Sequence, residues 1–367
     1  MTLALHQSVV GRPLQDVLKA AGVVGAGGAG FPTWAKYQTP HKTLIVNAQE
    51  SEPGYFIDKW LHDDKATELL DLLTWLRGWG VEKTVVAAKL KDRQSFARME
   101  HAAGLSTGGA RMLDSTGRNR HVLADQAEPV LFAYTDDKYA FGMETALLLI
   151  VAQQKIPQGE RPSQHGFIVS NSETLWNMHQ VMTTGKPVTH KFVHVYGAMT
   201  AHTFRQVPVG TPAAVMLQDA GVSLPDIAER GLVVVDGGPG WFERIDPATA
   251  VVSRRTNSIL VLDPTEVDLA KKDVLAAVGK PGYPRSGTVF STSPTPLHTD
   301  LVRLPLVDNA ALKAVRPATP VVVVGARVVV GDVVAVANDD GISVPVHASI
   351  AGVVVAVDDT GITVVAG

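Results

Sequence analysis

The chain has 367 residues, of which 46% are apolar and 19% are charged. This composition supports buried cores and excludes a disordered chain, and the length is enough for two or three domains. The net charge is −3 with acidic and basic residues well mixed, which excludes an electrostatic footprint for nucleic acid. We therefore expect small molecules or other proteins as partners.

The sequence lacks the features of secretion, membrane insertion and cysteine chemistry. Its start has neither the basic residues nor the apolar stretch of a signal peptide, and no apolar run approaches the roughly 20 residues that cross a bilayer. These features predict a cytoplasmic protein that is not integral to the membrane. Because the sequence contains no cysteine, these residues offer no disulfide, thiolate nucleophile or cysteine-ligated cluster.

The first half of the chain alternates between strand and helix patterns. Residues 13–21 predict a short amphipathic helix, with Gly22 suited to the position just past its end. Apolar β-branched runs at 43–48 and 83–90 predict strands, and the spacing of residues 66–80 predicts a helix between them. This order is typical of a βαβ unit with a parallel strand pair. The same patterns predict a strand at 130–135 and helices at 144–154 and 172–184.

The second half is richer in β-strand patterns. Short β-rich runs with one helical segment extend from about residue 190 to 263 and predict a small mixed domain. Residues 265–300 gather Pro, Gly, Ser and Thr and predict a linker or loop. From residue 301, valine runs broken by glycine-containing turns predict a compact sandwich or small barrel.

A glycine-rich loop, GAGGAGFPTWAK, covers residues 25–36. Its glycines permit positive φ and a close approach of the backbone to a planar or phosphorylated ligand. Successive amides in such a loop form an anion-binding nest, and Lys36 could add a point charge for a phosphate. A plain structural turn is the alternative, but the loop and the Phe-Pro-Thr that follows exceed what a turn requires.

A second polar segment, NAQESEPGYFIDK, covers residues 47–59 directly after a predicted strand. Ligands of open α/β sheets bind beyond the carboxyl ends of the strands, where Asn47, Glu50 and Glu52 are expected. Carboxylates there could bind sugar hydroxyls, and the alternative is an acidic loop that ends in a Pro-Gly turn. No histidine lies close enough in the sequence to favour a metal site.

Two further segments, YAFGMETAL at 139–147 and VSNSETLWN at 169–177, each open a predicted helix with a Glu-Thr pair. Taken singly, each is explained by favourable chemistry at a helix N-terminus. The 12 histidines are scattered without ligand spacing, and no Ser/His/Asp arrangement can be identified.

These four segments, in this order, resemble the flavin-bearing subunit of respiratory complex I and its relatives, the C subunit of the Rnf complex and the cobalamin reductase of propanediol utilisation. The resemblance implies an α/β, Rossmann-like FMN-binding domain at 1–187 and a β-grasp (soluble-ligand-binding) domain at 188–264. It also implies a linker without cluster cysteines at 265–300 and a lipoyl-like barrel-sandwich domain at 301–367. Residues 328–367 contain no lysine, so they offer no acceptor for lipoyl or biotin.

The resemblance also implies which residues hold the cofactor. FMN would rest on Gly25, Gly27, Gly28, Ala29 and Gly30, with Lys36, Asn47, Glu50, Tyr139, Glu144, Asn171 and Thr174 around its ring and tail. Glu52 and Phe31 match positions near the nicotinamide nucleotide. The sequence departs from the family patterns at Ala26, Thr39, Gln49 and Met143.

The function implied is that of an FMN-dependent oxidoreductase. It would take electrons from NAD(P)H or a redox partner protein and pass them to a soluble acceptor, such as cobalamin or quinone, without an iron–sulfur relay. The alternative is a non-catalytic binding or adaptor protein of the same fold. Thr39, Gln49 and Met143 favour the adaptor, whereas the intact glycine loop favours the oxidoreductase.

Overall fold

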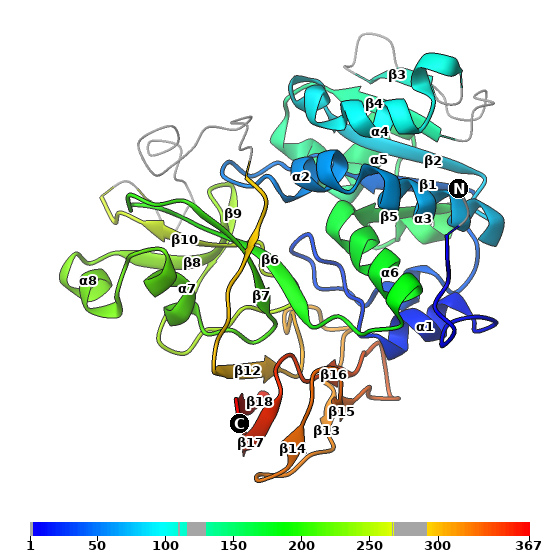
Figure 1. Cartoon of the computed structure of the whole chain (residues 1–367). Coiled ribbons are helices and arrows are strands. Elements are labelled where there is room, and N and C mark those ends of the chain that lie inside the picture. Colours follow the sequence, from blue (N-terminus) through cyan, green and yellow to red (C-terminus); the bar gives the residue numbers. More distant parts are fainter. Residues whose placement is uncertain (1–2, 109–110, 116–129, 266, 268–291) are drawn as a thin grey trace. The chain divides into compact units, whose positions relative to one another are not determined.

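The computed structural model describes residues 3–108, 111–115, 130–265, 267 and 292–367 (Figure 1). The chain forms two compact units. The first unit comprises residues 1–11, 36–51 and 56–185, and the second comprises residues 12–35, 52–55 and 186–367. The glycine-rich loop and Glu52 therefore belong to the second unit, and the other predicted site residues belong to the first.

The first unit contains a five-stranded sheet whose strand pairs are all parallel. In the order β3-β4-β2-β1-β5, its strands are β3 (Arg111–Ser115), β4 (Val130–Thr135), β2 (Lys83–Lys89), β1 (Thr43–Asn47) and β5 (Phe167–Asn171). The strands predicted at 43–48, 83–90 and 130–135 are confirmed. Both faces of β1 are buried, because its first four residues are all buried, as expected for a parallel sheet covered on two sides.

Helices join and cover these strands. The α3 helix (Ala66–Trp79) connects β1 to β2, which confirms the predicted βαβ unit. The predicted helices at 144–154 and 172–184 are α5 (Glu144–Ala152) and α6 (Ser172–Thr184). One face of the sheet packs Ile45, Val85 and Leu131 against Leu147 and Val151 of α5. The remaining helices described in this unit are α2 (Ile57–Asp64), α4 (Ala97–Ala102), η2 (Leu90–Phe96), η3 (Leu105–Thr107), η5 (Tyr139–Gly142) and η6 (Pro162–His165).

The second unit begins with α1 (Leu14–Ala20), which confirms the predicted helix at 13–21. The short η1 (Thr33–Lys36) follows the glycine-rich loop. A six-stranded mixed sheet has the order β11-β7-β6-β10-β8-β9. Its strands are β11 (Thr295–Pro296), β7 (Thr203–Pro208), β6 (His190–Gly197), β10 (Ser258–Leu262), β8 (Val233–Gly238) and β9 (Trp241–Arg244). The β6–β10 and β7–β11 pairs are parallel, and the others are antiparallel.

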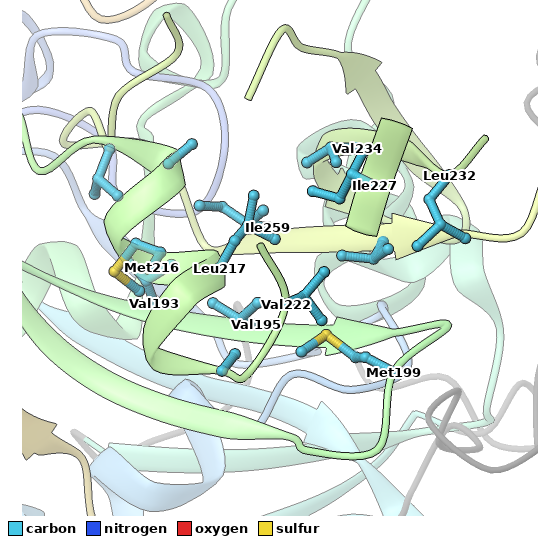
Figure 2. Packing of buried hydrophobic residues seen from close by; sticks show 14 of the residues in the cluster. Val193, Val195, Met199, Met216, Leu217, Val222, Ile227, Leu232, Val234 and Ile259 are labelled. Carbon is cyan, nitrogen blue, oxygen red and sulfur yellow. The ribbon is translucent and has the colours of Figure 1, made fainter. Parts of the chain in front are cut away.

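Two short helices, α7 (Ala213–Asp219) and α8 (Leu224–Glu229), contribute to the core of this mixed sheet. Figure 2 shows Met216 and Leu217 of α7 beside Val193 and Val195 of β6. Ile227, Leu232 and Val234 lie together at the other end of the same cluster (Figure 2). Because side chains alternate between the two faces of a strand, Val193 and Val195 both enter this core from β6.

The chain from residue 301 is built from strands, as predicted. One sheet has the order β12-β18-β17-β14, with β12 (Leu301–Pro305), β18 (Gly361–Val365), β17 (Gly352–Val357) and β14 (Arg327–Val328). The other has the order β13-β15-β16, with β13 (Thr319–Pro320), β15 (Val333–Val336) and β16 (Val346–His347). Both contribute to one buried cluster that includes Val302, Leu304, Val334 and Ile362. Most of the linker predicted at 265–300 lies outside the described residues, although β11 shows that its end pairs with the mixed sheet.

Candidate functional site

Asn47 and Asn171 end two neighbouring strands of the parallel sheet. They are register partners at the carboxyl ends of β1 and β5. The Asn47 side chain donates from Nδ2 to the Gly142 carbonyl at 2.8 Å, and its Oδ1 accepts from the Gln49 amide at 3.3 Å. The sheet therefore brings the predicted polar residues to its carboxyl edge, where open α/β sheets bind ligands.

Asn171 also fixes the start of α6. Its Oδ1 accepts from the Glu173 amide at 3.0 Å, which satisfies one of the backbone donors at the helix N-terminus. Its Nδ2 donates to Asp58 Oδ1 at 3.0 Å. Thr174 lies buried in the first turn of the same helix. The side chain of Asn171 thus couples this helix to a buried carboxylate on α2.

Glu50 adopts an unusual backbone conformation, with φ at +39°. This left-handed conformation costs a residue with a side chain about 1–2 kcal/mol. It places the carboxylate at the start of α2, where Oε1 accepts from the Asp58 amide at 3.0 Å and Oε2 from the Lys59 amide at 3.3 Å. Lys59 Nζ lies 3.6 Å from Glu50 Oε2 and 4.0 Å from Asp92 Oδ1. The carboxylate of this strained residue therefore caps the start of α2.

The side chains of Glu50 and Asp58 are both buried. Burial raises the pKa of Glu50, opposed by the charge of Lys59 and by the two backbone amides. Burial also raises the pKa of Asp58 well above its usual range, and the negative charge of Glu50 adds to this effect. Proton uptake by one of the acids is therefore favoured at this edge of the sheet.

Lys36 is held by two acceptors of the first unit. Its Nζ donates to Glu144 Oε1 at 2.6 Å and to the Val169 carbonyl of β5 at 2.9 Å. Both charged side chains are partly exposed, at 27% for Lys36 and 43% for Glu144. Tyr139 lies exposed in η5, the segment that leads into Glu144. Lys36 can therefore meet an anionic group if that group displaces Glu144 or joins the pair.

The glycine-rich loop of the second unit is closed by its own backbone. The Gly25 amide donates to the Phe31 carbonyl at 2.8 Å, and the Gly30 amide donates to the Gly25 carbonyl at 3.0 Å. Gly28 has φ at +101°, and a Cβ built there would meet no atom within 4 Å. Gly27 is exposed. The tip of the loop therefore presents backbone to open space, as an anion-binding nest requires.

The same loop is fastened on its other side. Asn309 Nδ2 donates to the Ala29 carbonyl at 2.9 Å. Gly30 has φ at +65°, and a Cβ there would lie 3.2 Å from side-chain atoms of Asn309 and Asp308 and 3.3 Å from Arg255. Glycine at this position is thus needed for close packing, whereas Gly28 leaves the loop tip open.

Glu52 is engaged within the second unit. Its Oε2 accepts from the Gly240 amide, in the turn between β8 and β9, at 2.7 Å. The backbone beside it packs on Tyr196, whose hydroxyl donates to the Pro53 carbonyl at 2.6 Å. A Cβ at Gly54 would lie 2.5 Å from the Tyr196 ring, so only glycine permits this approach. The carboxylate of Glu52 is therefore held by backbone contacts in this structure.

Several residues near the first unit's site were not predicted from the sequence. Asp58 and Lys59 join the network of buried acids. The only feature of the sequence that could have indicated them is their position in the polar segment 47–59. Gln49 is fully buried, its Oε1 accepts from Thr135 at 3.1 Å, and its Nε2 has no partner among the described residues. His62 is also fully buried, and burial lowers its pKa to about 3.

The residues of each unit fit the needs of FMN. A flavin ring system offers carbonyl oxygens and nitrogens, and the first unit provides a buried amide donor at Gln49, without a partner among the described residues, together with Asn47 and Asn171. A phosphate needs backbone donors or a cation, which Lys36 and the open tip of the glycine-rich loop can each supply. The donor chemistry is therefore suited to this cofactor.

Within the part of the chain that the structure describes, no helix has the length and apolar character to cross a membrane. The same residues contain no group of three or more His, Asp or Glu side chains arranged to hold a metal ion.

Comparisons with known proteins identify two domains. Residues 18–180 match the Nuo51 FMN-binding domain, and residues 301–366 match the RnfC barrel sandwich hybrid domain. The cobalamin reductase PduS of Citrobacter freundii is 28% identical over 250 residues, which cover 68% of this chain and 49% of that protein. The chain thus spans about half the length of this relative.

Two further proteins share the fold. The C component of the ion-translocating oxidoreductase complex of Erwinia tasmaniensis is 29% identical over 262 residues, which cover 70% of this chain and 29% of that protein. A crystal structure of an NAD+-reducing [NiFe]-hydrogenase in the H2-reduced state aligns with a TM-score of 0.51 and 20% identity, covering 72% of this chain and 49% of that one. The chain therefore carries a domain of the Nuo51 FMN-binding type and a domain of the RnfC barrel sandwich hybrid type, and it is similar to PduS and to the C component of the ion-translocating oxidoreductase complex.

Proposed function

We propose that this chain is an FMN-dependent oxidoreductase that accepts electrons from NAD(P)H or a partner protein and delivers them to a soluble acceptor such as cobalamin or quinone. Two of its relatives are named as a cobalamin reductase and as a component of an oxidoreductase complex, which supports the electron-transfer class. Bound FMN supplies hydride and single-electron chemistry, while the protein supplies position, hydrogen bonds and charge. The cytoplasm is the proposed compartment.

The observation that carries the proposal is the polar edge of the parallel sheet. Asn47 and Asn171 are in register there, and Glu50 and Lys36 follow from adjoining segments. The proposal assigns flavin contacts to the first-unit set Lys36, Asn47, Glu50, Tyr139, Glu144, Asn171 and Thr174. From the second unit it assigns Gly25, Gly27, Gly28, Ala29 and Gly30 to FMN and Phe31 and Glu52 to the nicotinamide nucleotide.

Each protein group has a definite physical role in this proposal. Lys36 would neutralise negative charge, since an ammonium group binds phosphate as a point charge. Asn47 and Asn171 would orient the cofactor, because their amides are fixed by the Gly142 carbonyl and by the α6 amide. The raised pKa values of Glu50 and Asp58 favour a stored proton near the edge, and proton storage suits a site where electrons arrive and leave.

The proposal also covers the domain plan and the route of electrons. We assign an FMN-binding domain to 1–187, a β-grasp domain to 188–264, a linker to 265–300 and the barrel-sandwich domain to 301–367. The mixed sheet with its central parallel β6–β10 pair supports the β-grasp assignment. Since these residues include no cysteine, the acceptor would meet the flavin without a cysteine-ligated relay in this chain.

The test is the visible spectrum of the purified protein, followed by addition of NADH without oxygen. Flavin absorbance that bleaches with NADH is the expected result. Flavin that bleaches only with a chemical reductant would assign the donor role to a partner protein. A colourless protein that fails to take up added FMN would contradict the proposal and favour the adaptor function.

A further inference from the structure

Two carbonyl groups of the glycine-rich loop are held by side chains from distant parts of the second unit. The Ala29 carbonyl accepts from Asn309 Nδ2 at 2.9 Å, and the Gly28 carbonyl lies 3.5 Å from Arg255 Nη1. Arg255 lies just before β10 of the mixed sheet, and Asn309 lies in the region that matches the RnfC barrel sandwich hybrid domain. Two successive carbonyls of the loop are therefore fixed from two different domains.

The side chains that hold the loop are themselves fixed. Arg255 Nε donates to the Asp308 carbonyl at 2.8 Å, and its Nη2 donates to Glu243 Oε2 at 2.7 Å. Asn309 Oδ1 accepts from the Ala311 amide at 3.1 Å, which directs its Nδ2 toward the loop. Both anchors are therefore ordered in the absence of a ligand, and such preorganisation reduces the entropic cost of binding.

The fixed carbonyls determine which way the backbone amides of the loop point. A peptide group is planar and trans, so its carbonyl and its amide point in opposite directions. A Gly28 carbonyl turned toward Arg255 thus turns the Ala29 amide away from that arginine. The amides of Gly27, Gly28 and Ala29 donate to no residue that the structure describes, and Gly27 and Ala29 are exposed. The loop therefore presents three consecutive amide donors, as in an anion-binding nest.

We propose that Asn309 and Arg255 are positioning residues for the FMN phosphate, because they hold the loop with the amides of Gly27, Gly28 and Ala29 available to it. This inference rests on the proposed flavin function and deepens it. Neither side chain needs to touch the cofactor, since each acts on a loop carbonyl. The barrel-sandwich domain thereby gains a role in cofactor binding, through Asn309.

The test compares Asn309→Ala with the matched control Asn338→Ala in the full chain. Both asparagines are half-buried and accept from the backbone amide two residues further on, at 3.1 and 2.9 Å. Asn309 also donates to the loop, whereas the hydrogen bond printed for Asn338 stays within its own turn. We expect Asn309→Ala to weaken FMN binding about threefold to tenfold, the scale of one hydrogen bond. Riboflavin, which lacks the phosphate, should bind both variants as it binds the parent.

A second pair of variants tests the other anchor. Arg255→Lys keeps the positive charge but loses the fork of donors that joins Asp308, Glu243 and the loop. Arg205→Lys is the control, because Arg205 also bridges two side chains, through Nε to Asp219 and through Nη1 to Thr295 on the mixed sheet. Fluorescence titration should show a loss of FMN affinity for Arg255→Lys and none for Arg205→Lys.

Hydrogen exchange of the flavin-free proteins measures the order of the loop without the cofactor. The amides of Gly25 and Gly30 donate within the loop, and we expect them to exchange faster in Asn309→Ala than in the parent or in Asn338→Ala. Unchanged exchange or unchanged FMN affinity in Asn309→Ala would overturn this inference alone. An equal loss for FMN and riboflavin would also overturn it, since the anchor would then serve the fold and not the phosphate. A parent that takes up no flavin would contradict the proposed function together with this inference.

Discussion

Asn171 Nδ2 donates to Asp58 Oδ1 at 3.0 Å, so that the residue that caps α6 also binds the first turn of α2. The two helices follow different strands of the parallel sheet and lie far apart in the sequence. One amide group therefore fixes two helix starts at the edge where the cofactor is proposed to bind.

Substitution of Asn171 tests separately its cap on α6 and its hydrogen bond to Asp58. Asn171→Ala removes both hydrogen bonds, and loss of an N-cap alone costs about 1 kcal/mol of the free energy of unfolding. Asn171→Ser keeps a capping oxygen but loses the donor to Asp58, so it should cost less. Urea denaturation of the flavin-free protein measures the free energy of unfolding of both variants. If alanine and serine proved equally stable, the cap would have no energetic role.

The open tip of the glycine-rich loop predicts a selective loss of FMN binding. Gly28→Ala forces a Cβ onto a residue at φ +101°, at a cost of about 1 kcal/mol in stability. Gly11→Ala is a matched control, because Gly11 has φ at +76° and equally open surroundings. We expect similar losses of stability but weaker FMN binding for Gly28→Ala alone. Fluorescence titration with FMN distinguishes the two, and equal affinities would argue against the loop as a phosphate site.

Lys36 should contribute its charge to the binding of the cofactor. Lys36→Met is expected to weaken FMN binding about tenfold or more, since charge-assisted hydrogen bonds are worth about 1.5–3 kcal/mol. Lys42→Met, at an exposed lysine before β1, should have no such effect. The dissociation constants for FMN and for riboflavin, which lacks the phosphate, provide the measurement. A loss that is the same for both ligands would assign Lys36 to the ring instead of the phosphate.

The buried acid network predicts a dependence of stability on pH. Because the pKa of Asp58 is raised in the folded state, the folded protein retains a proton that the unfolded chain releases above about pH 4. Its contribution to stability is therefore lost as the pH rises from that value through the folded pKa. We therefore compare the free energy of unfolding of Asp58→Asn with that of the parent at two pH values. The difference should be more favourable to the variant at pH 8 than at pH 4.5. Asp63→Asn, exposed on the same helix, should follow the parent at both values.

Breaking a buried ion pair in the second unit should cause a larger loss of folding stability than breaking an ion pair at the surface. The side chains of Arg254 and Asp308 are 5% and 2% exposed and meet at 2.7 Å. Asp308→Asn leaves the guanidinium buried without a counter-charge, at a cost of about 3 kcal/mol or more. Asp358→Asn, which removes the partner of Arg303 at the surface, should have a much smaller effect. Comparable losses of stability for the two variants would show that burial does not determine how much the Arg254–Asp308 pair contributes to stability.

Local patterns predicted much of the fold. The strands β1, β2 and β4 and the helices α3, α5 and α6 were all expected, because apolar period and capping residues act over a few neighbouring positions. The strands β3 and β5 and the helix α2 were not predicted. Phe167–Asn171 is short and ends in polar residues, so its strand state depends on pairing with β1, which no local pattern reveals.

The site was predicted as a set of residues but not as a network. Asn47 and Glu50 were expected at the carboxyl edge because they follow a strand pattern, and the structure places both there. The sharing of Lys59 between Glu50 and Asp92 was not predictable, since Asp92 lies on a segment after β2. Such contacts depend on strand order, which is a tertiary property.

The polypeptide passes between its two units after residues 11, 35, 51, 55 and 185. No single cut can therefore release either unit as an intact piece. A fragment ending near residue 187 would keep the glycine-rich loop but lose Asn309 and Arg255, which pack against it. Transfer of either unit as a whole into another protein would therefore need several chain breaks instead of one.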